Sequence, residues 1–307
     1  MRIAIVGSGG VGGYFGGRLA EAGADVTFLA RGAHLDALRT RGLRLLSSKG
    51  DLHLPRVNAT DDPRAVGPVD IALFAVKLYD TDSALAMLPP LLGPDTAVIP
   101  LQNGVESVDV LTRAIGPAHT VGGTCYVSAV IAEPGVIRHT AMDHLLFGEV
   151  DGSRSPRLET FLAACQPASF KSTLSANITV DIWTKFTRLS VFSGMTAVTR
   201  SPVGTIVNDP ELMAMLKAAL IEALTVAHAK GIAVSNDIVE DVARSYSGFP
   251  PHVRASMAED LERGRRLELP WLSGAVVRIG KQVGVPTPIH GFIATVLKPF
   301  VDGKPGG

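Results

Sequence analysis

The sequence predicts an α/β protein in which a doubly wound parallel sheet is followed by an all-helical C-terminal domain. Three observations lead to this prediction. A glycine-rich motif lies between a strand and a helix at the N-terminus, strands then alternate with helices, and only long helical periodicities remain beyond about residue 175. We therefore expect one domain over residues 1–173 and a second over residues 174–307.

The first predicted strand and helix enclose a Gly-x-Gly-x-x-Gly motif. The strand is an apolar run rich in β-branched residues over residues 1–6, and an apolar stripe marks the helix that follows. Gly7 permits a sharp turn, Gly9 leaves room for a pyrophosphate beside the backbone, and Gly12 lets the helix lie close to the strand. Unpaired N–H groups at the helix start attract phosphate. The sequence thus predicts an N-terminal Rossmann domain that binds a dinucleotide through Gly7, Ser8, Gly9, Gly10, Val11 and Gly12.

The end of the second predicted strand, residues 25–30, favours NADP(H) as the cofactor. NAD sites usually carry Asp or Glu at this strand end to accept hydrogen bonds from the ribose hydroxyls, whereas arginine suits a 2′-phosphate. This chain has Arg31 at that place and no acid. We therefore expect Arg31 to contact NADP(H).

The remaining N-terminal elements complete the parallel sheet. In chain order we predict helix 34–41, a peripheral hairpin of 43–46 with 52–54, strand 69–76, helix 81–88, strand 96–101, helix 106–115, strands 121–130, 136–139 and 145–147, and helix 157–165. The carboxyl ends of parallel strands meet at one edge of a sheet, where ligands bind. Gly9, Arg31, Lys77 and Asn103 all follow strands, so we expect them in one crevice.

The C-terminal domain is predicted to be helical throughout. Its helices are expected at 178–198, 210–230, 237–246, 253–263, 271–283 and 289–300. The glycine- and proline-containing tail over residues 302–307 should be frayed.

The composition narrows the function classes. The 29 basic and 29 acidic residues balance, so no overall field favours nucleic acid or a membrane surface. Met1 leads directly into the first strand and the longest apolar runs are too short for a membrane span, so we expect a cytoplasmic protein. The two cysteines lack a C-x-x-C spacing, which indicates buried thiols, and the scattered histidines predict no metal site.

Two residues of the helical domain are candidates for chemistry. The reactive end of the cofactor is expected between the domains, so catalytic groups should come from these helices. Trp183 and Phe186 could partly desolvate Lys185, which lowers the pKa of a lysine and makes it a better proton donor. The edge of an amphipathic helix explains the same lysine. Glu268 precedes Pro270 and is either a site residue or a favourable charge at a helix start.

The combined motifs resemble the ketopantoate reductase (2-dehydropantoate 2-reductase) family over nearly the whole chain. The matching residues are the Gly7 to Gly12 motif with Arg31, Val76-Lys77, Gln102-Asn103-Gly104, Trp183-Thr184-Lys185, the run from Ser256-Met257 through Asp260 to Glu268, and Gly284-Val285-Pro286-Thr287-Pro288. Each motif alone is modest, but their order and spacing together are specific.

The resemblance implies NADPH-dependent reduction of a 2-oxo acid to a 2-hydroxy acid, a step of pantothenate biosynthesis. It makes Lys185 the general acid that protonates the developing alkoxide, and Glu268 the acid that orients the reacting groups and meets the cofactor. It places Asn103 at the junction of nicotinamide and substrate, and Ser256 at the substrate carboxylate. Lys77 matches a further cofactor contact.

The chain departs from the family pattern in the substrate pocket. Three asparagines that contact the substrate in the family correspond to Leu189, Ser193 and Val203, so that Ser193 is the remaining polar candidate for substrate binding. Unpaired polar groups discriminate strongly between substrates. The expected substrate is therefore ketopantoate or a related, less polar carbonyl compound.

Two other functions fit parts of the sequence. One is a dehydrogenase of opine or 3-hydroxy acid type, which would place a histidine or a differently spaced lysine in the site. The other is an NADPH-binding regulatory protein without turnover, which the replaced asparagines favour and the retained Lys185 and Glu268 oppose. A homodimer is compatible with the apolar faces of residues 178–198 and 212–226, as is a buried core.

Overall fold

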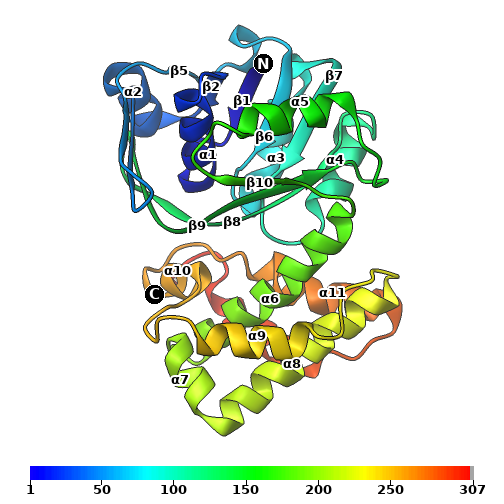
Figure 1. Ribbon diagram of the computed structural model, residues 1–307. Coiled ribbons are helices and arrows are strands. Elements are labelled where there is room, and N and C mark those ends of the chain that lie inside the picture. Colours follow the sequence, from blue (N-terminus) through cyan, green and yellow to red (C-terminus); the bar gives the residue numbers. More distant parts are fainter. Residues whose placement is uncertain (305–307) are drawn as a thin grey trace. The chain divides into compact units, whose positions relative to one another are not determined.

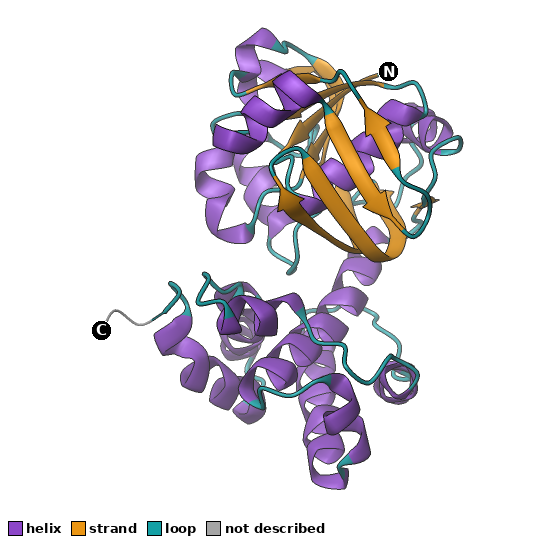
Figure 2. Cartoon of the chain, turned by 90° about the vertical axis from the view of Figure 1, so that its left-hand side faces the viewer, coloured by secondary structure: helices purple, strands orange, loops and turns teal. Residues whose placement is uncertain are grey.

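The structure is a computed structural model that describes residues 1–304 and divides into two compact units. The first unit comprises Met1–Gln102 and Glu106–Asp181 (Figure 1). The second, which we call the helical unit, comprises Asn103–Val105 and the chain from Ile182 onward. Figure 2 shows that the strands lie in the first unit and that helices and loops make up the other. The domain boundary placed after residue 173 stays a prediction.

The first unit is built on a five-stranded parallel sheet with the order β5-β2-β1-β6-β7. Its strands are β1 (Arg2–Val6), β2 (Asp25–Leu29), β5 (Asn58–Thr60), β6 (Val69–Phe74) and β7 (Leu92–Pro100). The chain leaves β1 toward β2 on one side and later returns to β6 on the other side. The strand order therefore reverses at β1, and ligands of such sheets bind at this reversal.

Helices alternate with the strands of the first unit, as the sequence pattern predicted. They are α1 (Gly10–Glu21), α2 (Gly32–Arg41), α3 (Thr81–Leu85), α4 (Ser107–Ile115) and α5 (Pro156–Cys165), with 3₁₀ turns at Pro63–Ala65, Leu78–Asp80 and Pro89–Leu91. The predicted helix over 81–88 ends early, at Leu85, and a 3₁₀ turn begins at Pro89. The fold class predicted from the sequence is confirmed.

A second, mixed sheet covers the other side of α1, and the sequence did not predict it. It contains β3 (Leu43–Ser47), β4 (Leu52–Leu54), β8 (Gly122–Glu133), β9 (Val136–Gly148) and β10 (Lys171–Leu174). The segments 136–139 and 145–147, predicted as separate strands, form the single strand β9. The prediction that the hairpin of 43–46 with 52–54 is peripheral is wrong in part, because Leu43 and Leu45 of β3 are buried in the core.

Glycines on two faces of α1 allow it to lie between the sheets. A Cβ at Gly12 would come within 2.8 Å of Ile5 in β1, and one at Gly13 would come within 2.8 Å of Ile137 in β9. One turn later Gly16 and Gly17 repeat this pattern against β1 and β3. Because both faces need close approach, the glycines beyond the motif are packing residues.

The helical unit contains the greater part of α6 (Ile178–Val198) and the helices after it. These are α7 (Val203–Asn208), α8 (Pro210–Ala229), α9 (Ile238–Ser247), α10 (Ser256–Glu262), α11 (Ser273–Val283) and α12 (Pro288–Leu297), with 3₁₀ turns at Leu269–Trp271 and Lys298–Phe300. The helix predicted from 253 begins only at Ser256, and the short α7 was not predicted. Of the predicted frayed tail, residues 305–307 lie outside the described residues, whereas Gly303 is buried and the Lys304 N–H donates to Gly264 O.

Two carboxylates accept hydrogen bonds from backbone N–H groups at helix starts in this unit. Asp209 accepts hydrogen bonds from the first backbone N–H groups of α8, and the nearly buried Glu222 accepts from Ile289 and His290 at the start of α12, at 2.8 and 3.0 Å.

Within the described residues α8 is also the helix long and apolar enough to span a membrane. A core helix meets the same criteria, and 44% of its most apolar window is buried.

Candidate active site and cofactor site

The glycine motif forms a turn with one open side. Gly7 has a φ of +93°, which favours glycine, and a Cβ at this position would strike the backbone of Val76. Ser8 is anchored to the end of β2, because its N–H and its hydroxyl both donate to Leu29 O at 3.2 and 3.0 Å. A Cβ at Gly9, in contrast, would have no atom within 4 Å of it. The turn therefore has the free space beside a helix start that a dinucleotide pyrophosphate requires.

Two basic residues follow the two strands that flank β1 in the parallel sheet. Arg31 is exposed directly after β2, and its guanidinium donates to the thioether of Met87 at 3.6 Å. Lys77 is exposed after β6, where its carbonyl begins a 3₁₀ turn. The structure thus places Arg31 and Lys77 at the carboxyl ends of the strands that flank β1, as their sequence positions predicted.

Lys185, Asn103 and Glu268 form one hydrogen-bonded network in the helical unit. Lys185 Nζ donates to Asn103 Oδ1 at 3.1 Å, and Asn103 Nδ2 donates to Glu268 Oε2 at 3.0 Å. Lys185 lies on α6, Glu268 lies in the segment after α10, and Asn103 lies in the loop after β7. Lys185 and Glu268 are only 9% and 7% exposed, whereas Asn103 between them is partly exposed.

The side chain of Glu268 bonds to Asn103 and does not cap the turn that follows it. Although Glu268 precedes the 3₁₀ turn at Leu269–Trp271, its side chain makes no capping hydrogen bond there. Its carboxylate instead accepts from Asn103, which orients the amide so that Oδ1 faces the ammonium of Lys185. The arrangement is suited to holding an ammonium beside a carbonyl oxygen.

The other predicted substrate residues make no hydrogen bond to the network of Lys185, Asn103 and Glu268 among the described residues. Ser193 lies two turns after Lys185 on α6 and is 1% exposed, while Ser256 is exposed at the start of α10. Val203 is fully buried in the core of the helical unit, which explains why an apolar residue stands at that position. Sequence reasoning missed Ser273, whose hydroxyl is buried and has no partner among the described residues. No pattern marks a single serine at a helix start as buried.

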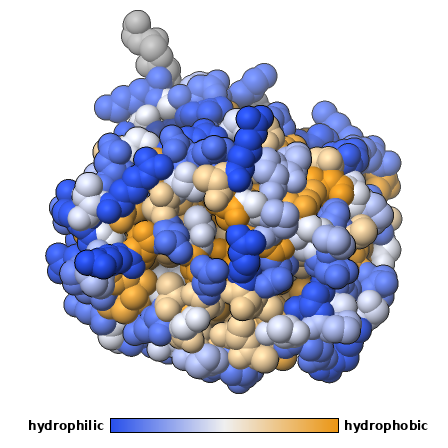
Figure 3. Space-filling model, turned by 90° about the horizontal axis from the view of Figure 1, so that it is seen from above, coloured by the Kyte–Doolittle hydropathy of each residue, from blue (hydrophilic) through white to orange (hydrophobic). Residues whose placement is uncertain are grey.

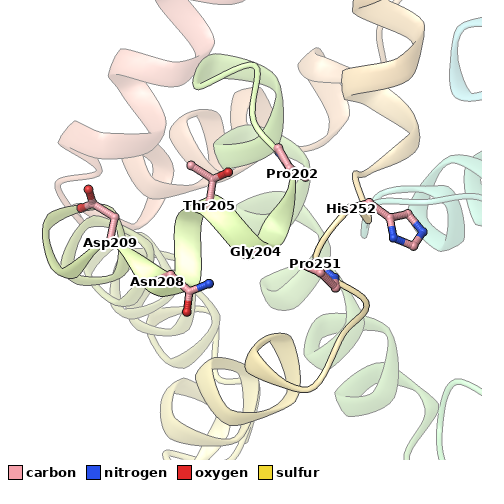
Figure 4. A pocket seen from close by; sticks show the side chains of 7 residues that line it. All are labelled: Pro202, Gly204, Thr205, Asn208, Asp209, Pro251 and His252. Atoms are coloured by element: carbon pink, nitrogen blue, oxygen red, sulfur yellow. The ribbon is translucent and has the colours of Figure 1, made fainter.

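A surface hollow in the helical unit is separate from this network. It is lined by Pro202, Gly204, Thr205, Asn208, Asp209, Pro251 and His252 (Figure 4). Figure 4 shows that the polar side chains point in different directions, and Asp209 already accepts from the start of α8. None of the predicted site residues lines it.

A Rossmann unit with an open glycine turn, joined to a helical unit with a buried lysine, amide and carboxylate, defines a two-domain nicotinamide-dependent oxidoreductase. The family model described as ketopantoate reductase PanE/ApbA matches residues 3–152, and the model of its C-terminal part matches residues 177–301. The chain belongs to the ketopantoate reductase family.

Individual relatives agree with this family. A 2-dehydropantoate 2-reductase from Mesorhizobium japonicum is 31% identical, over 98% of each chain. The crystal structure of a PanE/ApbA family ketopantoate reductase from Ralstonia eutropha JMP134 superposes with a TM-score of 0.90, at 32% identity and over 98% of each chain. A structure of D-mandelate dehydrogenase with NADH and anilino(oxo)acetate shares the fold, with a TM-score of 0.88 over 98% of each chain, at 20% identity.

Proposed function

We propose that the protein reduces a 2-oxo acid to a 2-hydroxy acid with NADPH, and that the substrate is ketopantoate or a related, less polar compound. The observation that carries the proposal is the hydrogen-bonded series from Lys185 through Asn103 to Glu268. It occurs in a chain of the ketopantoate reductase family that also has an open glycine turn.

In the proposed reaction the bound cofactor supplies a hydride from nicotinamide C4 to the carbonyl carbon. As the carbonyl bond opens, Lys185 Nζ gives a proton to the oxygen, and the lysine later regains a proton from water. Asn103 fixes the ammonium through Oδ1, and Glu268 prevents the amide from turning over. The ammonium also stabilises the negative charge that grows on the oxygen.

The role of Lys185 is tested by Lys185→Ala. We expect turnover to fall by about two orders of magnitude or more, as for loss of a general acid, with NADPH binding nearly unchanged. Lys281→Ala, which removes an exposed lysine from α11 of the same unit, is the matched control. Unchanged turnover in Lys185→Ala would remove this residue from the mechanism.

The preference for NADPH over NADH is proposed to come from Arg31. An exposed guanidinium at the end of β2 can pair with a 2′-phosphate, and no carboxylate stands there to hold the ribose hydroxyls of NADH. We expect Arg31→Ala to raise the KM for NADPH about tenfold or more and to leave the KM for NADH nearly unchanged. Equal changes in the KM values for both dinucleotides would contradict this role of Arg31.

The preference for a less polar substrate is proposed from Leu189 and Ser193. Both lie on α6 after Lys185, at positions where the family has amides. A panel of 2-oxo acids that includes ketopantoate and bulkier apolar analogues, followed by NADPH absorbance, tests it. Oxidation with ketopantoate at ordinary efficiency and no gain with apolar analogues would contradict the preference.

The same panel separates the two alternative functions. Binding of NADPH without oxidation by any compound would favour a regulatory protein. Activity with 3-oxo acids or with an amine plus a 2-oxo acid, and none with 2-oxo acids alone, would favour the other dehydrogenase type.

We also propose a cytoplasmic homodimer that associates through the helical unit. Ile221 on α8 and Phe292 and Val296 on α12 are exposed large apolar residues, and the two helices pack together. Sedimentation velocity of the unchanged protein and of Phe292→Glu tests the association, and a monomer in both cases would refute it. Cell fractionation tests the location.

A further inference from the structure

The hairpin of β8 and β9 lies directly against the start of α1. A Cβ on Gly10, the first residue of that helix, would be 2.1 Å from Ala129 O and 2.8 Å from Val130 N of β8. The neighbouring Gly9 has free space around it. One side of the glycine turn is thus covered by a strand backbone, while the side suited to a pyrophosphate stays open.

The tip of this hairpin is fixed by α2 and β3. The Gly135 N–H donates to Nδ1 of His34 at 3.1 Å, Arg41 donates to Pro134 O at 3.0 Å, and the Arg44 N–H donates to Gly135 O at 2.9 Å. Gly135 has a φ of +83°, so its N–H is directed by a turn that few other residues would adopt. The position of the hairpin therefore depends on contacts with the segment that begins directly after Arg31.

His34 makes its contact as a neutral imidazole. Because Nδ1 accepts a hydrogen bond, the ring proton is on Nε2. Burial lowers the pKa of His34, and the backbone of Ser8 raises it by a smaller amount. Nε2 is buried, and it faces the backbone of Ser8. The ring thus lies between the tip of the hairpin and the Ser8 side of the glycine turn.

We propose that His34 is a positioning residue for dinucleotide binding. By accepting from Gly135, it keeps β8 against Gly10 and so keeps the glycine turn in the shape that leaves Gly9 open. This inference rests on the proposed function only in requiring that the protein binds a nicotinamide dinucleotide, whichever of the two it prefers.

Two substitutions of His34 distinguish the loss of its hydrogen-bond acceptor from a change in the size of its side chain. In His34→Asn the side-chain oxygen can take the place of Nδ1, whereas the longer side chain of His34→Gln places its amide where Nε2 was. We expect the dissociation constant of NADPH, measured by fluorescence titration, to rise about three- to tenfold in His34→Gln and by less than twofold in His34→Asn. The kcat at saturating cofactor should stay within about twofold in both variants, because the ring contacts the hairpin of the first unit, whereas the Lys185 network belongs to the helical unit.

Hydrogen exchange supplies a second readout. The Gly135 amide should exchange faster in His34→Gln than in His34→Asn. Arg39→Ala is the control, because Arg39 lies on the same helix but bonds to Ala59 O and Asp61, and its dissociation constant should match the unchanged protein.

Failure of the role of His34 and failure of the proposed function give different results in these experiments. Equal dissociation constants for the Asn and Gln variants, with normal binding by the unchanged protein, would overturn the role of His34 alone. An unchanged protein that binds neither NADPH nor NADH would overturn the proposed function together with this inference.

Discussion

Acid should destabilise the helical unit through His290. The imidazole is fully buried, Nε2 lies 3.1 Å from Ala219 O, and Nδ1 has no partner among the described residues. Burial lowers the pKa of His290 from 6.5 to about 4, and the backbone of Ala219 opposes this shift only weakly. The folded protein therefore holds this ring neutral at a pH where the unfolded chain protonates it.

The size and sign of the effect follow from this difference. One pKa unit corresponds to about 1.4 kcal/mol, so the whole shift corresponds to about 3 kcal/mol. Above pH 6.5 neither state is protonated and the contribution is constant. As the pH falls from 6.5 toward 4 the unfolded state binds the proton first, so the free energy of unfolding decreases. The loss should reach about 2 kcal/mol at pH 5 and level off below pH 4.

Urea unfolding followed by tryptophan fluorescence measures this loss, because both tryptophans, Trp183 and Trp271, lie in the helical unit. In His290→Gln an amide N–H can still donate to Ala219 O, but no group titrates. The difference in unfolding free energy between the unchanged protein and this variant should shrink by about 2 kcal/mol between pH 7 and pH 5. His252→Gln, which alters an exposed histidine, should show no such trend. A difference that stays constant with pH would refute the reasoning.

Three further predictions follow from local geometry. Gly9→Ala should leave the melting temperature nearly unchanged and weaken dinucleotide binding about tenfold. Gly10→Ala should lower the melting temperature by several degrees, because the new Cβ meets Ala129 O. Thermal melting and NADPH titration of both variants check these outcomes. Burial raises the pKa of the Cys165 thiol to about 12, so a thiol reagent at pH 8 should label Cys165 only after unfolding, as mass spectrometry would show. Asp209→Ala should cost about 1 kcal/mol in urea unfolding, since it removes the cap of α8.

The elements that were predicted well are those whose signal is local. The apolar run of β1, the glycine motif and the periodicity of α6 each depend on neighbouring residues, and α6 begins and ends where its periodicity does. In contrast, β5 and β10 are three- and four-residue segments that are strands only because β2 and β9 supply hydrogen bonds. Pairing of this kind has no short-range pattern.

The strand β9 shows a second limit of local patterns. Its middle contains Met142 with a φ of +57° and two polar residues, so the apolar alternation stops there. The long antiparallel partner β8 carries the ladder across this interruption, with shifts in register beside Ser128. Local sequence therefore suggested two strands where tertiary pairing makes one.

The candidate site was predicted by resemblance rather than by spacing. Asn103 lies 82 positions from Lys185 and 165 from Glu268, and no periodicity connects such distances. What the structure adds is the direction of each hydrogen bond, and with it the orientation of the amide. The catalytic and binding roles of these residues stay predictions.

The glycine-lined helix α1 also limits how this protein can change. With sheets in contact on both of its faces, substitutions along α1 disturb the interior of the first unit, as the short distances at Gly12 and Gly13 indicate. Arg31, by comparison, is exposed at the surface. On the face of the molecule seen in Figure 3, hydrophilic and apolar side chains are interspersed. On the role proposed for Arg31, a substitution at this exposed position changes the preference between dinucleotides and leaves the packing of α1 undisturbed.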